Sequence, residues 1–232
     1  MNWIARLLGS RPRLEPGQAE ALSTYLALPV PDPDAAAEGQ RLVVVDVETS
    51  GLDPRRDRLL AIGAVAVDHG AIRFDDSFEI ILRQAAPSAN DNILVHGIDG
   101  STQCSGVDPA EALLGFLAYA AKSPLIGFHA AFDRVAIERA MRSALGAVPA
   151  NSWLDLATAA PAFFPEHADR AHALDDWTRL FGIDNHARHN ALADAYATAQ
   201  LLLIVMARAA GSSGRRWRDL MAASNAQRWL AR

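Results

Sequence analysis

The sequence has very little of what marks a secreted or membrane protein. Its 232 residues include one cysteine, Cys104, so an internal disulfide is impossible and a reducing compartment is the natural setting. No apolar run reaches the length of about 20 residues that spans a bilayer. Residues 1–9 lack the long apolar core and the cleavage site of a signal peptide. We therefore expect a cytoplasmic protein that does not enter a membrane.

Positive charge is also scarce. The formal net charge is −5, and nearly all of the positive charge is arginine, because Lys122 is the single lysine. Proteins that coat nucleic acid are usually basic, so this balance argues against a coating function. It is compatible with an enzyme whose site is acidic because the site holds metal ions.

Composition divides the chain into three parts. Residues 1–40 are predicted to be an N-terminal helical appendage and linker, with helices at 3–8 and 15–26 followed by a segment rich in proline, acidic and small residues. Residues 41–210 are predicted to form the main domain. Residues 211–232 are predicted to be a basic C-terminal tail that ends in a short helix.

The main domain opens with three predicted strands, 42–48, 59–67 and 72–82. The tripeptide Asp68-His-Gly70 is a hairpin signal, so these strands should form an antiparallel meander. Helix and strand then alternate, with helices at 108–121, 132–145, 174–181 and 191–210 and strands at 124–127 and 153–155. A meander followed by αβα units predicts an α/β fold with a mixed sheet flanked by helices.

Two acids, Asp46 and Glu48, stand at the end of the first apolar run. Residues i and i+2 of a strand point to the same face, so this strand would aim two carboxylates at one point. Like charges side by side repel each other, and a divalent metal ion between them is the simplest remedy. The alternative is an amphipathic strand with two solvated acids, although the strand is otherwise apolar on both faces.

Three further residues stand out by their context. Asp133 begins a helix after a strand, where active sites of open α/β sheets gather; the alternative is a first-turn acid that favours the helix dipole. Asp194 lies in an apolar helix, where a carboxylate is costly to bury unless it is paired or bound to metal. His189 precedes it by five residues, about 140° around a helix axis. We therefore expect His189 on the loop before the helix, facing the same pocket; the alternative is a surface histidine with a solvated acid.

In chain order these residues read Asp-x-Glu, Asp and His-x-x-x-x-Asp. The pattern resembles the signature of the DEDDh 3′–5′ exonucleases, the family that includes the proofreading epsilon subunit of bacterial DNA polymerase III. The resemblance covers residues 41–209. It rests on Asp46-Val-Glu-Thr-Ser-Gly-Leu52, Leu94-Val-His-Gly-Ile98, Gly127-Phe-His-Ala-Ala-Phe-Asp133 and His189-Asn-Ala-Leu-Ala-Asp194. Each motif is weak alone, and four in this order are highly specific.

The resemblance implies an RNase H-like fold and a two-metal-ion exonuclease. Two divalent ions, Mg²⁺ or Mn²⁺, would be held by Asp46, Glu48, Asp133 and Asp194, because hard cations prefer oxygen ligands. By the same resemblance, His189 would be the general base. The implied reaction removes nucleoside 5′-monophosphates from the 3′ end of single-stranded DNA, in proofreading or repair.

The resemblance also implies contacts to the terminal nucleotide. The substrate-binding residues would be Thr49, Leu52, His96, His129 and Phe132. One departure lies in the second motif, where the family commonly has His-Asn and this chain has Phe128 and His129. The substrate contact made near that Asn therefore depends here on His129.

Two alternatives to a DNA exonuclease remain open. One is an exoribonuclease acting on small or structured RNA, because a terminal 2′-OH is recognised by only a few pocket atoms. The other is a catalytically weak binding or docking module, which the five intact catalytic residues oppose. The expected partners are single-stranded 3′ ends, with DNA favoured over RNA. A DNA polymerase, or self-association through the N-terminal helices, is a further hypothesis.

Overall fold

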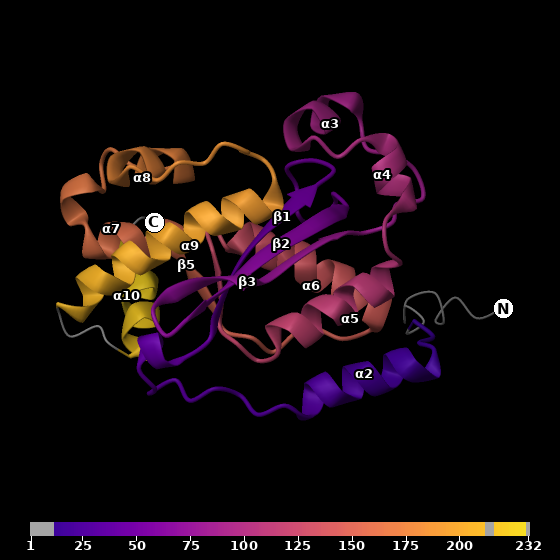
Figure 1. Ribbon diagram of the computed structural model, residues 1–232, viewed down its shortest axis with the longest axis horizontal. Coiled ribbons are helices and arrows are strands. Elements are labelled where there is room, and N and C mark those ends of the chain that lie inside the picture. The colour runs from indigo at the N-terminus through magenta and orange to yellow at the C-terminus, as the bar shows by residue number, and fades with distance from the viewer. Residues whose placement is uncertain (1–11, 212–215, 231–232) are drawn as a thin grey trace.

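The computed structural model describes residues 12–211 and 216–230, and a five-stranded mixed sheet forms its centre (Figure 1). The strands are β1 (Leu42–Thr49), β2 (Leu59–Asp68), β3 (Ala71–Ile81), β4 (Leu125–Gly127) and β5 (Trp153–Asp155). Their order across the sheet is β3-β2-β1-β4-β5. β1, β2 and β3 pair antiparallel, whereas β4 is parallel to both β1 and β5. The predicted α/β fold with a meander followed by αβα units is confirmed.

Burial follows from strand position. β2 is buried at every residue except Asp68, and β1 is buried as far as Val45, because both are interior strands covered on two faces. The edge strand β3 is mostly exposed. His69 and Gly70 join β2 to β3 with φ values of 50° and 71°. A two-residue link with positive φ at both positions matches the twist of a hairpin, as the Asp-His-Gly signal predicts.

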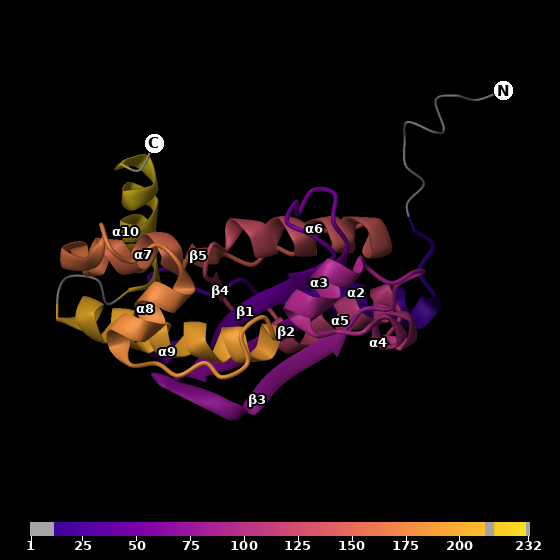
Figure 2. The ribbon, with the colours of Figure 1, turned by 90° about the horizontal axis from the view of Figure 1, so that it is seen from above.

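Helices cover both faces of the sheet, as Figure 2 shows from above. One face carries α7 (Leu156–Phe163), α8 (Leu174–Phe181), α9 (Ala191–Ala210) and α10 (Trp217–Leu230); the other carries α2 (Pro16–Ala27), α5 (Pro109–Ala120) and α6 (Ala131–Leu145). The shorter helices are η1 (Ala37–Gly39), α3 (Asn90–His96), α4 (Gly100–Ser105) and η2 (Pro165–His167). Each face has its own cluster of buried apolar side chains, so the sheet separates two cores.

Within the described residues, α9 is the helix that is long and apolar enough to cross a membrane by length and composition alone. In this fold 56% of its most apolar window is buried inside the domain. The helix packs against β1 and β2. Its apolar composition is therefore accounted for by core packing.

Several helices were not predicted from the sequence. The helices α3, α4 and α7 have six to eight residues each, too few for a clear 3.6-residue period. Caps help to define two of them, because the carboxylate of Asp99 accepts the Thr102 N–H at the start of α4 and that of Asp155 accepts the Ala157 N–H at the start of α7. The predicted short helix in the tail is the 14-residue α10.

Both chain extensions lie against the main domain. Tyr25 of α2 is buried near α5, and its hydroxyl donates to Asn151 Oδ1 over 2.7 Å. The linker and the tail meet in an antiparallel bridge between Ala36 and Arg216 and in an ion pair of 2.5 Å between Asp34 and Arg218. The helix predicted at 3–8 lies outside the described residues. The domain boundaries at 40 and 210 stay a prediction.

A close approach at Gly63 sets the position of α9. Gly63 lies on β2 opposite Asp46 of β1. A Cβ atom built on Gly63 would lie 2.2 Å from the backbone nitrogen of Leu192 and 2.3 Å from the carbonyl carbon of Ala191. The N-terminal turn of α9 can therefore reach the sheet only where β2 has no side chain.

Gly63→Ala is expected to destabilise the protein, because the new methyl group would meet helix backbone that cannot rotate away. Overpacking of this kind costs about 1–3 kcal/mol, and thermal or urea unfolding would measure it. The matched control is Gly17→Ala in α2, where an added Cβ meets nothing within 4 Å. Alanine is the better helix former, so this variant should be neutral or slightly stabilising. Equal stability of the two variants would contradict the importance of the Gly63 contact.

Candidate active site

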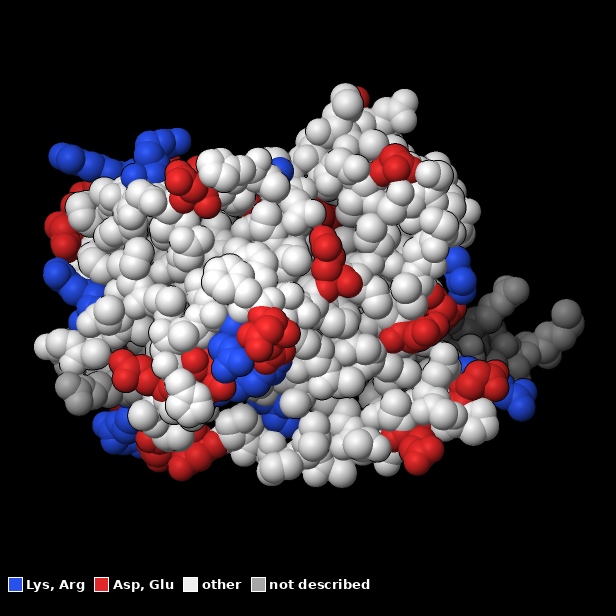
Figure 3. Space-filling model, in the orientation of Figure 1, with Lys and Arg blue, Asp and Glu red and all other residues white. Residues whose placement is uncertain are grey.

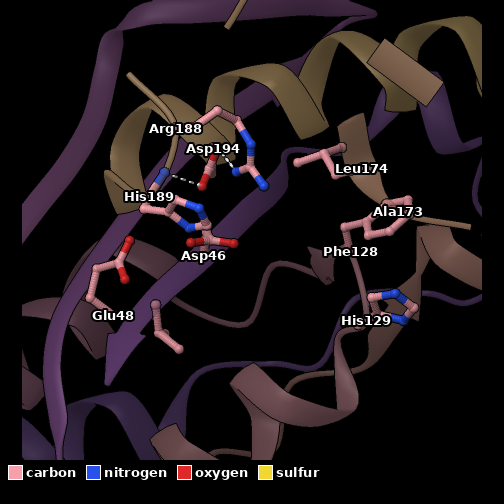
Figure 4. A pocket seen from close by; sticks show the side chains of 10 residues that line it. Asp46, Glu48, Phe128, His129, Ala173, Leu174, Arg188, His189 and Asp194 are labelled. Atoms are coloured by element: carbon pink, nitrogen blue, oxygen red, sulfur yellow. Dashed lines mark hydrogen bonds and ion pairs between the residues drawn. The ribbon is translucent and has the colours of Figure 1, made fainter. Parts of the chain in front are cut away.

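The site begins at the carboxyl end of β1. Asp46 and Glu48 are two residues apart on this strand, and both side chains are half-buried. The register between β1 and β2 shifts directly after Glu48, so regular pairing ends where the acids end. Both carboxylates face the same cavity (Figure 4), as the period of a strand predicts.

The third acid, Asp194, comes from the first turn of α9 and is buried. Asn190 caps this helix, because its side-chain oxygen accepts the Ala193 N–H over 2.9 Å. The preceding loop folds over Asp194: the His189 backbone N–H donates to Oδ2 over 3.1 Å, and Asn185 Nδ2 donates to Oδ1 over 2.5 Å. His189 has a φ of 64°, an unusual conformation for a residue with a side chain that brings its N–H to the carboxylate.

Among the described residues, one group of three acids is arranged to hold a metal ion. Ligand oxygens of Asp46, Glu48 and Asp194 all lie within 4.8 Å of one another. Asp133, the fourth predicted ligand, does not belong to this set. It is buried in the first turn of α6, its carboxylate accepts the Val47 backbone N–H, and its Oδ2 faces Gly127 at the end of β4.

The crowding perturbs the acids strongly. Burial, with the nearby Asp194 carboxylate, raises the pKa of Glu48 to about 8. Burial also raises the pKa of Asp133 to about 8. The pKa of Asp46 is raised well above its usual range by burial and by the charge of Asp133 in particular, so Asp133 belongs to the site electrostatically. Near neutral pH these carboxyl groups therefore ionise together less readily than isolated ones, and positive charge nearby would favour their ionised forms.

The predicted substrate residues fall into two separate cavities. Thr49, Leu52, His96 and Phe132 line a cavity of about 300 Å³ beside α3. His129 lines another of about 270 Å³, the one that contains Asp46 and Asp194. Glu48 and His189 border both cavities. His189 lies on the loop before α9, as its five-residue offset from Asp194 predicts.

The departure in the second motif has a structural explanation. The Phe128 ring is buried in the apolar core under α9, and His129 is exposed with a φ of 58°. The two rings meet edge to face with centroids 4.9 Å apart. Phe128 therefore serves packing, and His129 is the polar group that this motif presents to the cavity.

Three polar residues of the site were missed by the sequence analysis. Arg188 Nη1 lies 2.5 Å from Asp194 Oδ1, Arg188 Nε lies 2.5 Å from Asp175 Oδ1, and Asn185 donates to Asp194. The charge of Arg188 opposes the rise in pKa of Asp46 and of Glu48. The position of Arg188 directly before His189 could have indicated a site residue. The sequence cannot show, however, that Asp175 of α8 lies beside Arg188.

Without metal, stability should fall as the pH rises. The pKa of Glu48 is about 8 in the folded protein against an ordinary value of 4.5. A raised folded-state pKa contributes stability that is fully present below the unfolded value and is lost as the pH rises through the folded one. In EDTA, the melting temperature should therefore fall between about pH 4.5 and pH 8.

Glu48→Gln should flatten this pH profile and raise the melting temperature at pH 8. A change of 1 kcal/mol corresponds to about 2–4 °C for a chain of this size. The control is Glu20→Gln on the exposed face of α2, which should follow the wild-type profile. A Glu48→Gln profile parallel to wild type would contradict the assigned cause.

Known proteins with similar sequences are exonucleases or DNA polymerase III proteins, which is consistent with the acidic site. The model of the exonuclease family RNase_T matches residues 43–202. A DNA polymerase III PolC-type protein of Thermotoga petrophila is 26% identical over 170 residues, 73% of this chain and 12% of the relative. A DNA polymerase III subunit epsilon-like protein of Rhodobacter capsulatus is 30% identical over 164 residues, 69% of this chain and 23% of that protein. The chain thus spans about an eighth of the PolC-type relative.

The solved structures show the same fold. Exonuclease I of E. coli in complex with a dT13 oligonucleotide superposes with a TM-score of 0.65 at 19% identity, over 74% of this chain and 42% of that one. An apo structure of exonuclease I gives a TM-score of 0.62 at 20% identity, over 79% of this chain and 44% of that one. The sheet and the helices on its faces are therefore of the RNase H-like type. The chain belongs to the RNase_T exonuclease family, which confirms the DEDDh 3′–5′ exonuclease resemblance of its motifs.

Proposed function

We propose that this protein removes nucleotides one at a time from the 3′ end of single-stranded DNA. The observation that carries the proposal is a pair of cavities that share Glu48 and His189 as lining residues, one of which also contains Asp46 and Asp194. A strand that crosses the acids would place its terminal nucleotide in one cavity and the preceding nucleotide in the other. The scissile phosphate would then lie above the carboxylates.

The cavity beside α3 suits a terminal nucleotide. Leu52 is 95% exposed at its rim, and Val95 and Phe132 add apolar surface. Bases stack on apolar and aromatic groups with little regard to sequence. Thr49, at the end of β1, donates its hydroxyl to the Gly51 carbonyl over 2.6 Å, which holds the turn that presents Leu52.

His96 lines the same cavity and carries a buried hydrogen-bond donor. Its Nδ1 accepts the Ile98 N–H over 3.0 Å, so in the neutral ring the proton is on Nε2. This Nε2 is buried and has no hydrogen-bond partner in the part of the chain that the structure describes. Burial lowers the pKa of His96, which keeps the ring neutral. The free donor supports a role in holding an acceptor atom of the terminal nucleotide.

The acids fit divalent metal ions. Three carboxylates with oxygens within 4.8 Å are a hard, anionic donor set, which suits Mg²⁺ or Mn²⁺. Asp46, Glu48 and Asp194 would hold the ions, with Asp133 close to Asp46. When bound, two such ions stabilise the charge on the attacking and the leaving oxygens of a phosphodiester.

We infer that His189 acts as the general base. Its backbone N–H donates to Asp194 Oδ2, and its exposed side chain lines both cavities. Figure 4 shows it in the cavity that contains Asp46 and Asp194. A base must lie within hydrogen-bond reach of the proton it removes. A water molecule attacking a phosphate above the carboxylates would be in that position, and His189 would accept its proton.

The names of related proteins support DNA as the substrate. The solved exonuclease I structures include complexes with dT13 and dA16 oligonucleotides, and the related sequences are named as DNA polymerase III proteins. Their names also support proofreading or repair as the setting. A polymerase partner, or self-association through the N-terminal helices, stays a prediction.

A ladder assay tests the proposal. DNA and RNA strands of the same sequence, labelled at the 5′ end, are incubated with Mg²⁺, with Mn²⁺ and with EDTA. We expect stepwise shortening from the 3′ end that needs metal and is faster for DNA. Faster shortening of RNA would replace the DNA proposal with an exoribonuclease, and no shortening of either strand would favour a docking module.

Two substitutions separate the assigned roles. Asp194→Asn should abolish turnover and also weaken the Mn²⁺-induced rise in melting temperature, because binding to the folded state adds stability. His189→Ala should keep the Mn²⁺ shift and lose about 10²–10⁴-fold in rate. A wild-type rate for Asp194→Asn would contradict the two-metal mechanism. A wild-type rate for His189→Ala would contradict the assignment of His189 as the general base.

A further inference from the structure

Arg188 lies at the cavity that contains Asp46 and Asp194, on the loop between α8 and α9 (Figure 4). Its guanidinium is held at two points, with Nη1 at Asp194 Oδ1 and Nε at Asp175 Oδ1, each over 2.5 Å. A guanidinium carries five N–H donors in a fixed plane. No group in the described ranges accepts a hydrogen bond from Nη2. The side chain is 33% exposed and lines the cavity, so Nη2 is the donor that remains for a ligand there.

The ion pair leaves a metal-binding position on Asp194. Among the residues that the structure describes, Oδ1 accepts from both Asn185 and Arg188, whereas Oδ2 accepts only the His189 N–H. Each carboxylate oxygen has about two lone pairs, so Oδ1 is saturated and Oδ2 keeps one. A metal ligand at Oδ2 and the arginine at Oδ1 are therefore compatible, and Arg188 need not move when the acids hold metal.

The surroundings of Arg188 suit an anionic strand. Figure 3 shows acidic and basic side chains interspersed on the face toward the viewer, with no continuous basic surface there. Arg188 is the cation that opposes the raised pKa values of Asp46 and Glu48. Divalent ions held by Asp46, Glu48 and Asp194 would reduce the negative charge beside Arg188, while Asp175 keeps its pair with Nε. The largely buried side chains of Phe128 and Leu174 form the apolar wall of the same cavity.

We propose that Arg188 binds a non-scissile phosphate of the nucleic-acid strand through the open edge of its guanidinium, next to the metal-binding acids. This inference rests on the proposed exonuclease function and adds a strand-binding residue to it. Two carboxylates fix the guanidinium beforehand, so little side-chain freedom is lost on binding. Arginine is suited to this role because its planar fork matches the oxygens of a phosphate.

The test measures equilibrium binding of a labelled single-stranded oligodeoxynucleotide to the full chain, with Ca²⁺ replacing Mg²⁺ and strand integrity checked on a gel. The variants are Arg188→Met and Arg188→Lys. The control is Arg179→Met, because Arg179 of α8 is exposed and pairs with Asp176. We expect about tenfold weaker binding for Arg188→Met, as for other hydrogen bonds to charged groups, an intermediate loss for Arg188→Lys and none for the control. The slope of log K against log salt should shrink by about 0.7.

A scan with neutral methylphosphonate linkages then locates the contact. At one internal position, replacing the phosphate should weaken binding to the wild type but leave binding to Arg188→Met unchanged. At every other position, the replacement should affect both proteins equally. Equal sensitivity of both proteins at every position would overturn the proposal. So would a smaller Mn²⁺-induced rise in melting temperature for Arg188→Met, since that result would mean that Arg188 acts by orienting Asp194. If the wild type itself neither binds nor shortens the strand, the proposed function fails rather than the role of Arg188.

Discussion

Repulsion among carboxylates is the constraint around which this structure is built. Oxygens of Asp46, Glu48 and Asp194 lie within 4.8 Å of one another, with Asp133 beside them. At an effective dielectric constant of about 20, one pair of charges at 4 Å costs about 4 kcal/mol. The fold offsets part of this with donors aimed at the acids, namely backbone N–H groups and the guanidinium of Arg188. Metal ions would supply the rest.

The topology explains how the acids can meet at all. β1 and β4 are parallel neighbours, so their carboxyl ends lie at one edge of the sheet, where ligand sites of open α/β folds form. Asp46 and Glu48 belong to β1, and Asp133 lies after β4, in the first turn of α6. Asp194 approaches from one face, where the missing side chain of Gly63 lets α9 touch the sheet. A side chain at position 63 would push α9 away from the sheet. Asp194 would then lie farther from Asp46 and Glu48, although none of the three acids had been substituted.

The site also reconciles an acidic protein with an anionic substrate. The chain carries a net charge of −5, so long-range attraction does not favour a polyanion. Positive charge is placed locally instead, at Arg188 and at the ions that the acids are suited to hold. By the proposed function, the apolar cavity near Leu52 and His96 would add contacts to bases that depend little on charge. Affinity for the strand would therefore depend on metal more than on surface charge.

The sequence by itself determined the α/β fold, the order of its main elements and the acids of the site, because strand and helix periods are local properties of the chain. It also placed His189 on the loop before α9. Only the tertiary structure decided that Thr49 and His129 line different cavities, that Arg188 bridges Asp175 and Asp194, and that the extensions pack against the domain. These features join side chains that are distant in sequence or lie on different elements, and no periodicity along the chain encodes such contacts.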